Sequence, residues 1–331
     1  SARLADAEFF LDVDRRQSST ARREALQRVT FAEGLGSLLD RCERIERLTD
    51  QLNQCLPVSA EVASTASQAA RFCKHDLVSQ MVGEFPELQG LIGGKYLLEE
   101  GEPRGVALAV VEHYLPKGAG GELPATEAGA VVALAERLEL LLSIYAKGER
   151  PSGSSDPYAL RRAGNGVLLL LWDNQWRLDL LSLLSDAVAV WSDFFPDFQV
   201  DQEALRGDLM LLLRQRIVSQ LEEDGHAPDL VQAVAGGAMS DERLLRDPVD
   251  VQDRIKLLQG LREKGELSAL QSVVQRAARL AEKGDLSLDN LSPSDVVDPS
   301  LFESPSEKGM HAVVESLEPL ATSRTYPDLA A

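Results

Sequence analysis

The sequence predicts an all-α protein, and three features of its composition and patterning support this. The 331 residues are 44% hydrophobic but only 5% aromatic. Leu, Ala, Glu and Arg, which favour helices, are abundant, whereas the residues that fill strand-rich sandwiches are not enriched. Apolar residues also recur at helical spacing in one segment after another. A chain of this length buries about 75% of the surface that its unfolded form exposes, so we expect a conventional core.

The first segments are predicted to form a lead-in followed by two helices. Residues 3–14 are amphipathic, and we expect Phe9 and Phe10 to pack this lead-in. Residues 21–54 carry apolar side chains at helical spacing, interrupted by Gly34 and Gly36. Two helices with a glycine break between them are the simplest interpretation.

Ser59 is placed to cap the next helix, which is predicted to run as far as a turn at residues 83–90. Its apolar face comprises Val62, Ala66, Ala69, Cys73 and Leu77. This spacing places Asp76 near the buried stripe. His75 is rotated about 100° away from Asp76, so we expect it to be more exposed.

The middle of the chain is predicted to hold three more helices. One spans residues 106–114 and ends at Pro116. Another begins near Thr126, with its Leu and Val residues on one face. Glu136, Arg137 and Glu139 are expected on a different face of that helix. In the third, Asp156 resembles a helix cap with Pro157 at the first helical position.

The rest of the chain is also predicted to be helical. Trp172, Trp176 and Trp191 follow a leucine run and are expected in the core rather than as stacking platforms for bases. Helices are expected over residues 180–195, 201–223, 227–235, 240–246, 248–283 and 307–322, with a loop over 284–306. Pro196 interrupts the pattern, so we place a domain boundary near residue 200, which divides the chain into 1–200 and 201–331.

The net charge of −19 argues against an autonomous nucleic-acid binder, because the averaged field repels polyanions. With a Debye length of about 8 Å, however, a polyanion responds mainly to the local patch that it touches. Local basic residues would therefore have to carry any RNA contact. The adjacent Arg161 and Arg162, and the basic residues between Arg254 and Lys283, are the candidates. Arginines that pair with acids on solvated helix faces are the alternative interpretation.

Cysteine usage and hydropathy indicate the compartment. The three cysteines form no C-x-x-C pair, so neither a disulfide framework nor a four-cysteine zinc site is expected, and a reducing cytoplasm is favoured. The longest apolar run, residues 167–172, is far shorter than the roughly 20 residues that span a bilayer, so we expect no membrane partner. Because the chain begins with Ser1 rather than methionine, we expect an excised piece of a longer protein.

His75 and Asp76 raise the hypothesis of a metal-dependent phosphohydrolase of the HD type, in which an adjacent His and Asp supply two ligands. Such a site needs about four protein ligands from several helices. None of the four histidines precedes residue 75, and Glu136 stands where a later helix would offer an aspartate. We therefore expect no metal and no catalytic residue. Phosphate loops, dinucleotide fingerprints, nucleophile elbows and H-E-x-x-H motifs are also absent from the sequence.

Several strings nevertheless match one family. Residues 74–90 carry Lys-x-Asp-Leu followed by Met-Val-x-Glu-Phe-x-Glu-Leu-Gln-Gly, and residues 113–116 read His-Tyr-Leu-Pro. Residues 153–162 read Gly-Ser-x-Asp-Pro-x-Ala-Leu-Arg-Arg. Further landmarks lie at residues 6–10, 134–139 and 297–303. Together these strings resemble the beta subunit of the bacterial two-subunit glycyl-tRNA synthetase, over almost the whole chain.

The resemblance implies an HD-like helical domain over residues 1–200, followed by a helical linker and an incomplete, DALR-like anticodon-binding domain over 201–331. In this family the alpha subunit activates glycine with ATP and Mg²⁺, and the beta subunit holds tRNA(Gly) in an α2β2 assembly. The fragment itself is expected to need no cofactor and to be non-catalytic. The residues expected to contact tRNA phosphates are Lys74, Arg161, Arg162, Arg254, Arg276 and Arg279.

Two alternatives remain open from the sequence. One is the phosphohydrolase centred on His75, Asp76 and Glu136. The other is an acidic helical scaffold, for which no salt-dependent tRNA binding is expected.

Overall fold

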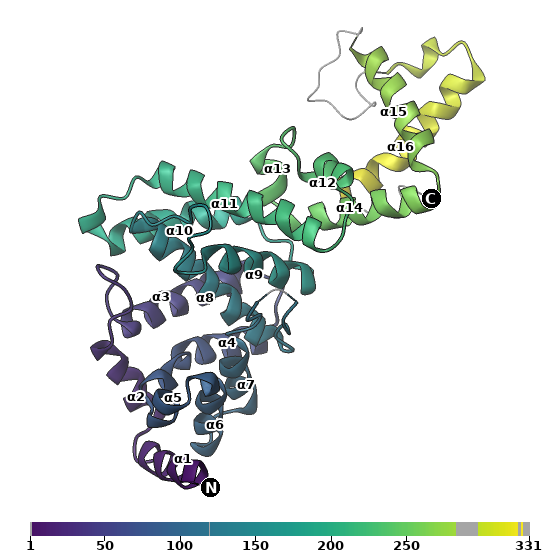
Figure 1. Cartoon of the computed structure of the whole chain (residues 1–331). Coiled ribbons are helices and arrows are strands. Elements are labelled where there is room, and N and C mark those ends of the chain that lie inside the picture. The colour runs from purple at the N-terminus through teal and green to yellow at the C-terminus, as the bar shows by residue number, and fades with distance from the viewer. Residues whose placement is uncertain (1, 119, 283–296, 324–325, 327–331) are drawn as a thin grey trace. The chain divides into compact units, whose positions relative to one another are not determined.

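Helices form all the regular secondary structure of the described residues. The computed structural model describes residues 2–118, 120–282, 297–323 and 326. Within these ranges the only bridges of β type are two isolated pairs, Thr30 with Ser37 and Ser152 with Ser155. The all-α prediction is confirmed (Figure 1).

The chain divides into two compact units. Unit 1 comprises Ser1–Gln220 with Met239–Val249, and unit 2 comprises Leu221–Ala238 with Asp250–Ala331. The assignment of residues 1–200 and 201–331 to an HD-like and an anticodon-binding domain stays a prediction.

The first ten helical segments lie in unit 1. They are α1 (Ala2–Asp14), α2 (Ser19–Ala25), η1 (Leu26–Arg28), α3 (Leu38–Cys55), α4 (Ala60–Phe72), η2 (His75–Val78), α5 (Gln80–Glu84), η3 (Pro86–Leu88), α6 (Leu91–Glu99) and α7 (Arg104–Glu112). The glycine break predicted between two helices is confirmed, since residues 34 and 36 lie between α2 and α3 and both have positive φ. α6 was not predicted. Gly94 lets α6 approach α7 closely, because a Cβ there would lie 2.7 Å from the carbonyl oxygen of Ala107.

The remaining segments follow in chain order. They are α8 (Glu127–Ala146), α9 (Leu160–Asp173), α10 (Leu180–Phe194), η4 (Pro196–Phe198), α11 (Gln202–Glu223), α12 (Pro228–Ala235), α13 (Asp241–Leu245), α14 (Pro248–Glu263), α15 (Leu267–Ala281), η6 (Pro299–Leu301) and α16 (Pro305–Ser323). The single helix predicted over 248–283 is wrong, because Gly265, with φ 77°, separates α14 from α15. Most of the loop predicted over 284–306 lies outside the described residues.

Side chains at the helix starts explain why these elements begin where they do. Ser59 accepts a hydrogen bond from the Val62 N–H at 3.2 Å, so the predicted cap of α4 is confirmed. Thr126 does the same for Gly129 at the start of α8, at 3.0 Å. Asp156 accepts from the Leu160 and Arg161 N–H groups, but α9 begins at Leu160, so the prediction of Pro157 as the first helical residue is wrong.

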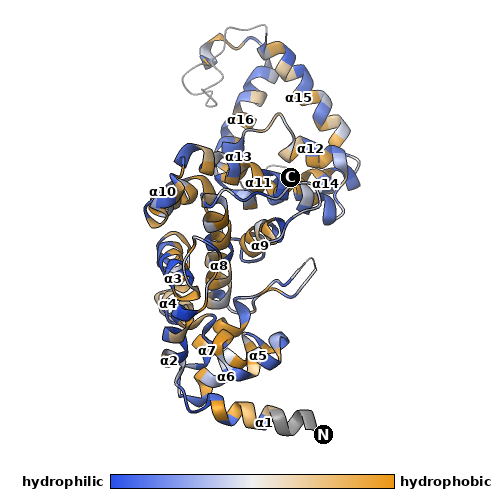
Figure 2. Ribbon diagram, turned by 60° about the vertical axis from the view of Figure 1, so that its left-hand side comes forward, coloured by the Kyte–Doolittle hydropathy of each residue, from blue (hydrophilic) through white to orange (hydrophobic). Residues whose placement is uncertain are grey.

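α8 is the central helix of unit 1, and it packs against α3, α4, α7, α9 and α10. Its sequence is hydrophobic along most of its length (Figure 2). The predicted core tryptophans are confirmed, since Trp172, Trp176 and Trp191 are all buried. Trp191 donates from Nε1 to the hydroxyl of Ser143 on α8 at 3.0 Å, which ties α10 to the centre.

A smaller apolar cluster ties the lead-in to α5 and α6. Met81 and Tyr96 belong to its buried part, and Phe10 packs against it. Phe9, by contrast, is 63% exposed, so the prediction that both phenylalanines pack the lead-in holds only for Phe10. The carboxylate of Asp14 accepts hydrogen bonds from the Met81 N–H at 3.0 Å and the Tyr96 hydroxyl at 2.7 Å, which fixes the end of α1.

Unit 2 is held together by apolar contacts and a few polar pairs. Leu230 and Val231 of α12 and Ile255 of α14 are buried. Arg262 forms an ion pair with Asp229, which joins the same two helices. α15 and α16 carry several exposed apolar residues, among them Val274 and Met310. No helix within the described ranges is both long enough and apolar enough to cross a membrane.

Candidate functional site

A backbone break after α4 sets the geometry around His75. α4 ends at Phe72, and Lys74 adopts a left-handed conformation with φ 67° before the η2 turn begins. Because the helix does not continue through Lys74, the rotation of 100° per residue does not apply beyond it. His75 is fully buried, so the prediction of a surface histidine is wrong. Asp76 is buried as predicted.

Both ring nitrogens of His75 have partners. Arg22 donates from Nε to Nδ1 of His75 at 3.4 Å, so Nδ1 must be unprotonated. Nε2 then carries the proton and donates to the Gly93 carbonyl at 3.2 Å. Burial, and then the nearby Arg22 guanidinium, lower the pKa of His75 to about 3. The imidazole is therefore neutral.

Asp76, the residue after His75, forms hydrogen bonds with the start of α6. Its Oδ2 accepts hydrogen bonds from the Gly90 N–H at 2.6 Å and the Gly93 N–H at 3.1 Å. Burial raises the pKa of Asp76, although these two N–H groups act in the opposite direction. Its role in the described structure is to connect η2 to α6.

Glu136 lies at the centre of an ion-pair cluster. Its Oε1 is 2.7 Å from Nη2 of Arg41 and 3.1 Å from Nζ of Lys74. Burial opposes its ionisation, but Lys74 and Arg41 outweigh burial and hold the pKa of Glu136 well below its usual range. Glu139, one turn later, accepts from Nε of Arg41 at 2.7 Å and from Nε of Arg44 at 2.8 Å.

This cluster corrects the prediction that Glu136, Arg137 and Glu139 occupy a separate polar face. Glu139 is fully buried and Arg137 is 6% exposed, because other helices surround α8. The guanidinium of Arg137 donates to the carbonyl of Pro116 at 2.9 Å and of Ala133 at 2.8 Å. The polar side of α8 thus packs against arginines and carbonyl groups instead of facing water.

Lys74 also has partners on its other side. Its ammonium lies 3.3 Å from Nε2 of His113 and 4.3 Å from the centre of the Tyr114 ring. Nδ1 of His113 donates to the Val110 carbonyl at 2.6 Å, so Nε2 is the acceptor and this imidazole is neutral too. Burial, followed by Lys74, holds the pKa of His113 well below its usual range.

These contacts test whether the HD positions fit a divalent cation, and they do not. Both nitrogens of His75 are engaged, and the Glu136 carboxylate is paired with two cationic side chains. Arg22, Arg41 and Lys74 surround the positions that a metal would share. Among the described residues, no three His, Cys, Asp or Glu side chains are arranged as a metal site.

A pocket of about 330 Å³ adjoins the Glu136 cluster in unit 1. Glu136 on α8 and Tyr114 are among its lining residues, and Lys117, Tyr158 and Arg162 line it from the loops and the start of α9. Arg162 is exposed and Arg161 is half-buried. The left-handed residue Ala159, with φ 56°, turns the chain into α9 just before this pair.

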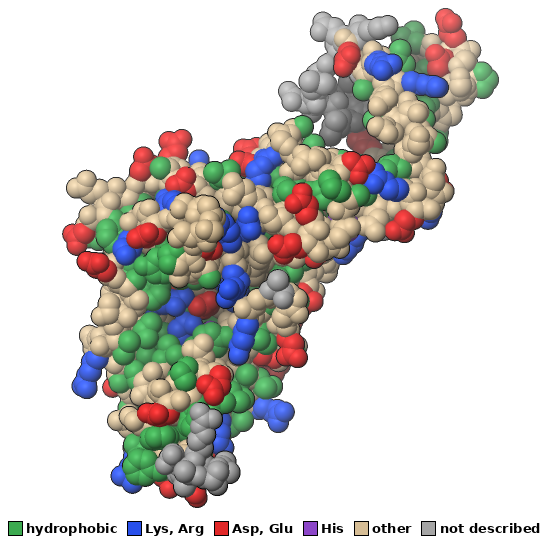
Figure 3. Space-filling model, viewed as in Figure 1, with side chains coloured by type: hydrophobic (Ala, Val, Ile, Leu, Met, Phe, Trp, Pro, Cys, Tyr) green, Lys and Arg blue, Asp and Glu red, His purple; other side chains and the backbone are tan. Residues whose placement is uncertain are grey.

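The remaining candidate residues are not among those that line this pocket. Arg254 lies on α14 and its Nε is 2.9 Å from Oδ2 of Asp250. Arg276 and Arg279 are exposed on α15. All three belong to unit 2, whereas Lys74, Arg161 and Arg162 belong to unit 1. On the face shown in Figure 3, Lys and Arg side chains are interspersed with Asp and Glu side chains.

Sequence reasoning missed Arg22, Arg41 and Arg44 as partners of the buried acids. A signal was present for two of them. Arg41 and Arg44 are three residues apart and interleave with the apolar Cys42 and Ile45, and Glu136 and Glu139 have the same spacing on α8. These matching spacings are compatible with a contact between the two helices, but they do not identify it.

Comparison with known proteins identifies the family. The family described as "Glycyl-tRNA synthetase beta subunit" matches residues 1–236. A "Glycine--tRNA ligase beta subunit" of Acaryochloris marina is 42% identical over 334 residues, which cover 99% of this chain and 46% of that protein. The proteins of the same name from Synechocystis sp. and Ectopseudomonas mendocina are 39% and 34% identical, over 99% of this chain and 47% and 46% of theirs. This chain, which spans about half the length of the curated relatives it matches, belongs to the glycyl-tRNA synthetase beta subunit family.

Proposed function

We propose that this chain is a non-catalytic, tRNA-binding part of the beta subunit of glycine-tRNA ligase. It holds tRNA(Gly) so that the alpha subunit can glycylate it in an ATP-dependent reaction. The complete enzyme works in the cytoplasm as an α2β2 assembly. ATP and Mg²⁺ serve that complete enzyme, and this part binds neither.

The observation that carries the proposal is the pairing of Glu136 with Lys74 and Arg41 in a member of a ligase-subunit family. The residues at the positions of an HD-type hydrolytic centre have other partners instead: His75 bonds to Arg22 and Gly93, Asp76 to backbone N–H groups, and Glu136 to Arg41 and Lys74. This supports a helical body that recognises its ligand without transforming it. Its contribution to the reaction is then one of position, because a tRNA end that is held near a separate active site reacts as if at high local concentration.

The pocket beside this cluster supports a contact with the tRNA backbone. Arg162 and Lys117 line it, and they can approach phosphate oxygens. Tyr158, which also lines the pocket, offers a ring face to a base or a sugar. Lys74 ranks lower as a phosphate ligand, since its ammonium is buried against Glu136 and His113. Arg276 and Arg279 are candidates on unit 2.

The test compares two double variants in the full-length beta subunit, reconstituted with its alpha subunit. Arg161→Ala with Arg162→Ala removes the candidate pair. Arg16→Ala with Arg104→Ala removes two other exposed arginines and serves as the matched control. We expect the first pair to weaken tRNA binding and slow glycylation about tenfold, and the control to change neither.

Equal affinities and equal glycylation rates for the two double variants would remove Arg161 and Arg162 from the tRNA site. If the intact complex fails to bind tRNA at every salt concentration tested, the acidic scaffold would be favoured instead.

A further inference from the structure

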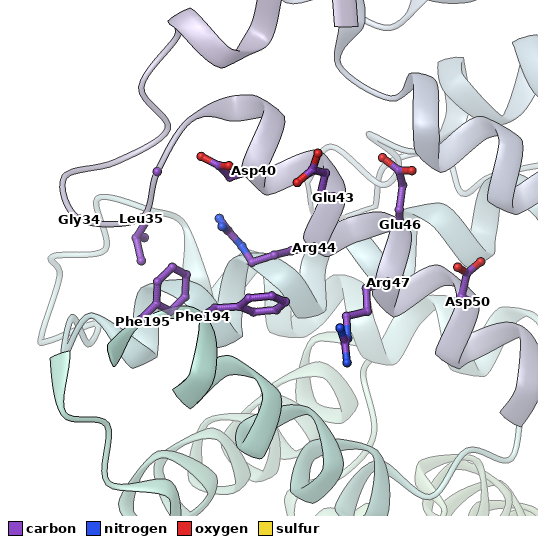
Figure 4. Close-up of a pocket in the computed structure, with 11 residues that line it drawn as sticks. Gly34, Leu35, Asp40, Glu43, Arg44, Glu46, Arg47, Asp50, Phe194 and Phe195 are labelled. Carbon is purple, nitrogen blue, oxygen red and sulfur yellow. The ribbon is translucent and has the colours of Figure 1, made fainter. Parts of the chain in front are cut away.

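A groove of about 640 Å³ runs alongside α3 in unit 1, separate from the pocket described above. Phe194 and Phe195, at the end of α10, form one side of it, and the glycine turn at residues 34–36 closes one end (Figure 4). Phe194 is 39% exposed, and the guanidinium of Arg47, which also lines the groove, lies 5.8 Å from the centre of its ring.

The α3 side of the groove carries four acidic residues and two arginines, Arg44 and Arg47. Asp40, Glu43, Glu46 and Asp50 recur at intervals of three or four residues, so they lie along one side of the helix (Figure 4). Asp40 is engaged by Ser37 in the cap of α3, and Glu46 is paired with Arg23. Glu43 is exposed and forms no hydrogen bond or ion pair with any residue that the structure describes. It is therefore available to a cationic group.

Arg44, which also lines the groove, is a second and independent indication of a ligand. Its side chain is only 5% exposed, and its Nε is already bonded to Glu139. Its Nη2 has no hydrogen-bond partner within the described part of the chain. A buried guanidinium nitrogen without a partner costs stability, and an acceptor brought by a ligand would remove that cost.

The combination of groups selects the kind of occupant. The carboxylates can form ion pairs with Lys or Arg. The aromatic ring of Phe194 can pack against the aliphatic stem of such a side chain. Arg44 can donate a hydrogen bond to a carbonyl or carboxylate oxygen. A peptide segment carries all three. RNA does not fit, because the carboxylates that line the groove outnumber its arginines by four to two and would repel the phosphates. A second copy of this chain is disfavoured by its own net charge of −19.

We propose that this groove is the docking site for a basic segment of the alpha subunit. The proposal rests on the proposed function, since it takes its partner from the two-subunit ligase. A Lys or Arg of the segment pairs with Glu43, its stem lies on Phe194, and a main-chain carbonyl next to it accepts a hydrogen bond from Arg44.

The experiment measures the affinity of the full-length beta subunit for the purified alpha subunit by isothermal titration calorimetry. Glu43→Lys with Asp50→Lys reverses two charges of the groove. Asp186→Lys with Glu222→Lys makes the same change in net charge on exposed parts of α10 and α11 outside the groove. We expect the groove variant to bind about tenfold more weakly and the control to bind as the native subunit does. Equal affinities of the two variants would overturn the proposal.

Two further measurements distinguish a loss of the groove's charges from poor folding of the double variant, and identify what binds there. Glu43→Lys alone loses no described partner, so it tests the groove even if the double variant folds poorly. A photo-crosslinking amino acid in place of Glu43 should attach to a Lys- or Arg-containing peptide of the alpha subunit. Attachment to tRNA, to another beta subunit or to nothing would contradict the proposal.

The affinity for tRNA, measured on the same samples, separates this inference from the proposed function. Loss of alpha-subunit binding supports the groove whether or not the native subunit binds tRNA. Unchanged alpha-subunit binding with normal tRNA binding overturns the groove and leaves the proposed function standing.

Discussion

Glu136 links separate segments of unit 1, because charged side chains from α3 and from the residue before η2 meet it on α8. Arg41 comes from α3, Lys74 from the residue before η2, and Glu136 itself from α8. The arrangement satisfies two buried cations at once. Removal of one partner from such a cluster is costly, since the remaining charges stay buried without compensation.

Glu136→Gln should therefore destabilise the protein by about 3 kcal/mol, the lower end of the range for a broken buried pair. Gln keeps the shape of the side chain but not its charge. The midpoint of urea unfolding measures the loss, and Glu84→Gln, at an exposed position, is the control and should change little. A shift no larger than that of the control would mean that the ion pairs contribute nothing.

The two buried histidines predict a dependence of stability on pH. The pKa of His75 is about 3 in the folded protein and about 6.5 in an unfolded chain, so between these values the unfolded state binds more protons. Stability must then fall as pH drops below about 6.5, by up to about 1.4 kcal/mol per pH unit for each such histidine. His113 acts in the same direction.

His75→Gln should flatten this dependence, because Gln can still donate to the Gly93 carbonyl but does not titrate. Thermal unfolding midpoints at several values between pH 7 and pH 5 measure the effect. The same slope in the native protein and the variant would show that His75 does not take up a proton on unfolding.

At the scale of elements, the break at Lys74 decides which way the following residues point. Lys74, two residues after the end of α4, is left-handed, and η2 then turns His75 and Asp76 inward. The helix propensities of residues 59–77 give no warning of this, because Lys is a good helix former. The partner that holds Lys74 in place, Glu136, lies 62 residues further along the chain and is invisible to local pattern reading.

A pair of substitutions at residue 74 isolates the free-energy cost of its left-handed backbone conformation. Lys74→Gly and Lys74→Ala both remove the ammonium, but Gly adopts the left-handed conformation without steric cost. We expect the Gly variant to be more stable than the Ala variant by about 1 kcal/mol. At Gln68, inside α4, we expect the Ala variant to be more stable than the Gly variant by a similar amount, since Gly is the poorer helix former. Free energies of unfolding for the four variants provide the test, and the same order at both sites would contradict the break.

At the scale of the whole molecule, the net charge of −19 has to be reconciled with a proposed RNA ligand. Salt screens charges beyond about 8 Å, so the acidic remainder of the surface weakens a local basic contact only in part. Binding that rests on a few arginines and lysines should then depend steeply on salt.

We expect the affinity of the reconstituted enzyme for tRNA to fall with rising salt, and the plot of log K against log salt to become shallower when Arg161 and Arg162 are replaced by alanine. Two phosphate contacts account for a change in slope of about 1.4 to 1.8. Filter binding between about 50 and 200 mM salt measures it. Parallel lines for the native and variant enzymes would mean that neither arginine touches a phosphate.

The sequence by itself determined the fold class, most helices, the cap at Ser59, the start of a helix near Thr126, the core tryptophans and the family. All of these depend on local spacing or on strings of neighbouring residues. It did not determine the burial of His75, the inward face of Glu136 and Glu139, or the partners Arg22, Arg41 and Arg44. Only the tertiary structure decided those, because a charged residue is stable in the interior when a partner from a distant segment meets it there, and periodicity along one helix carries no information about that partner.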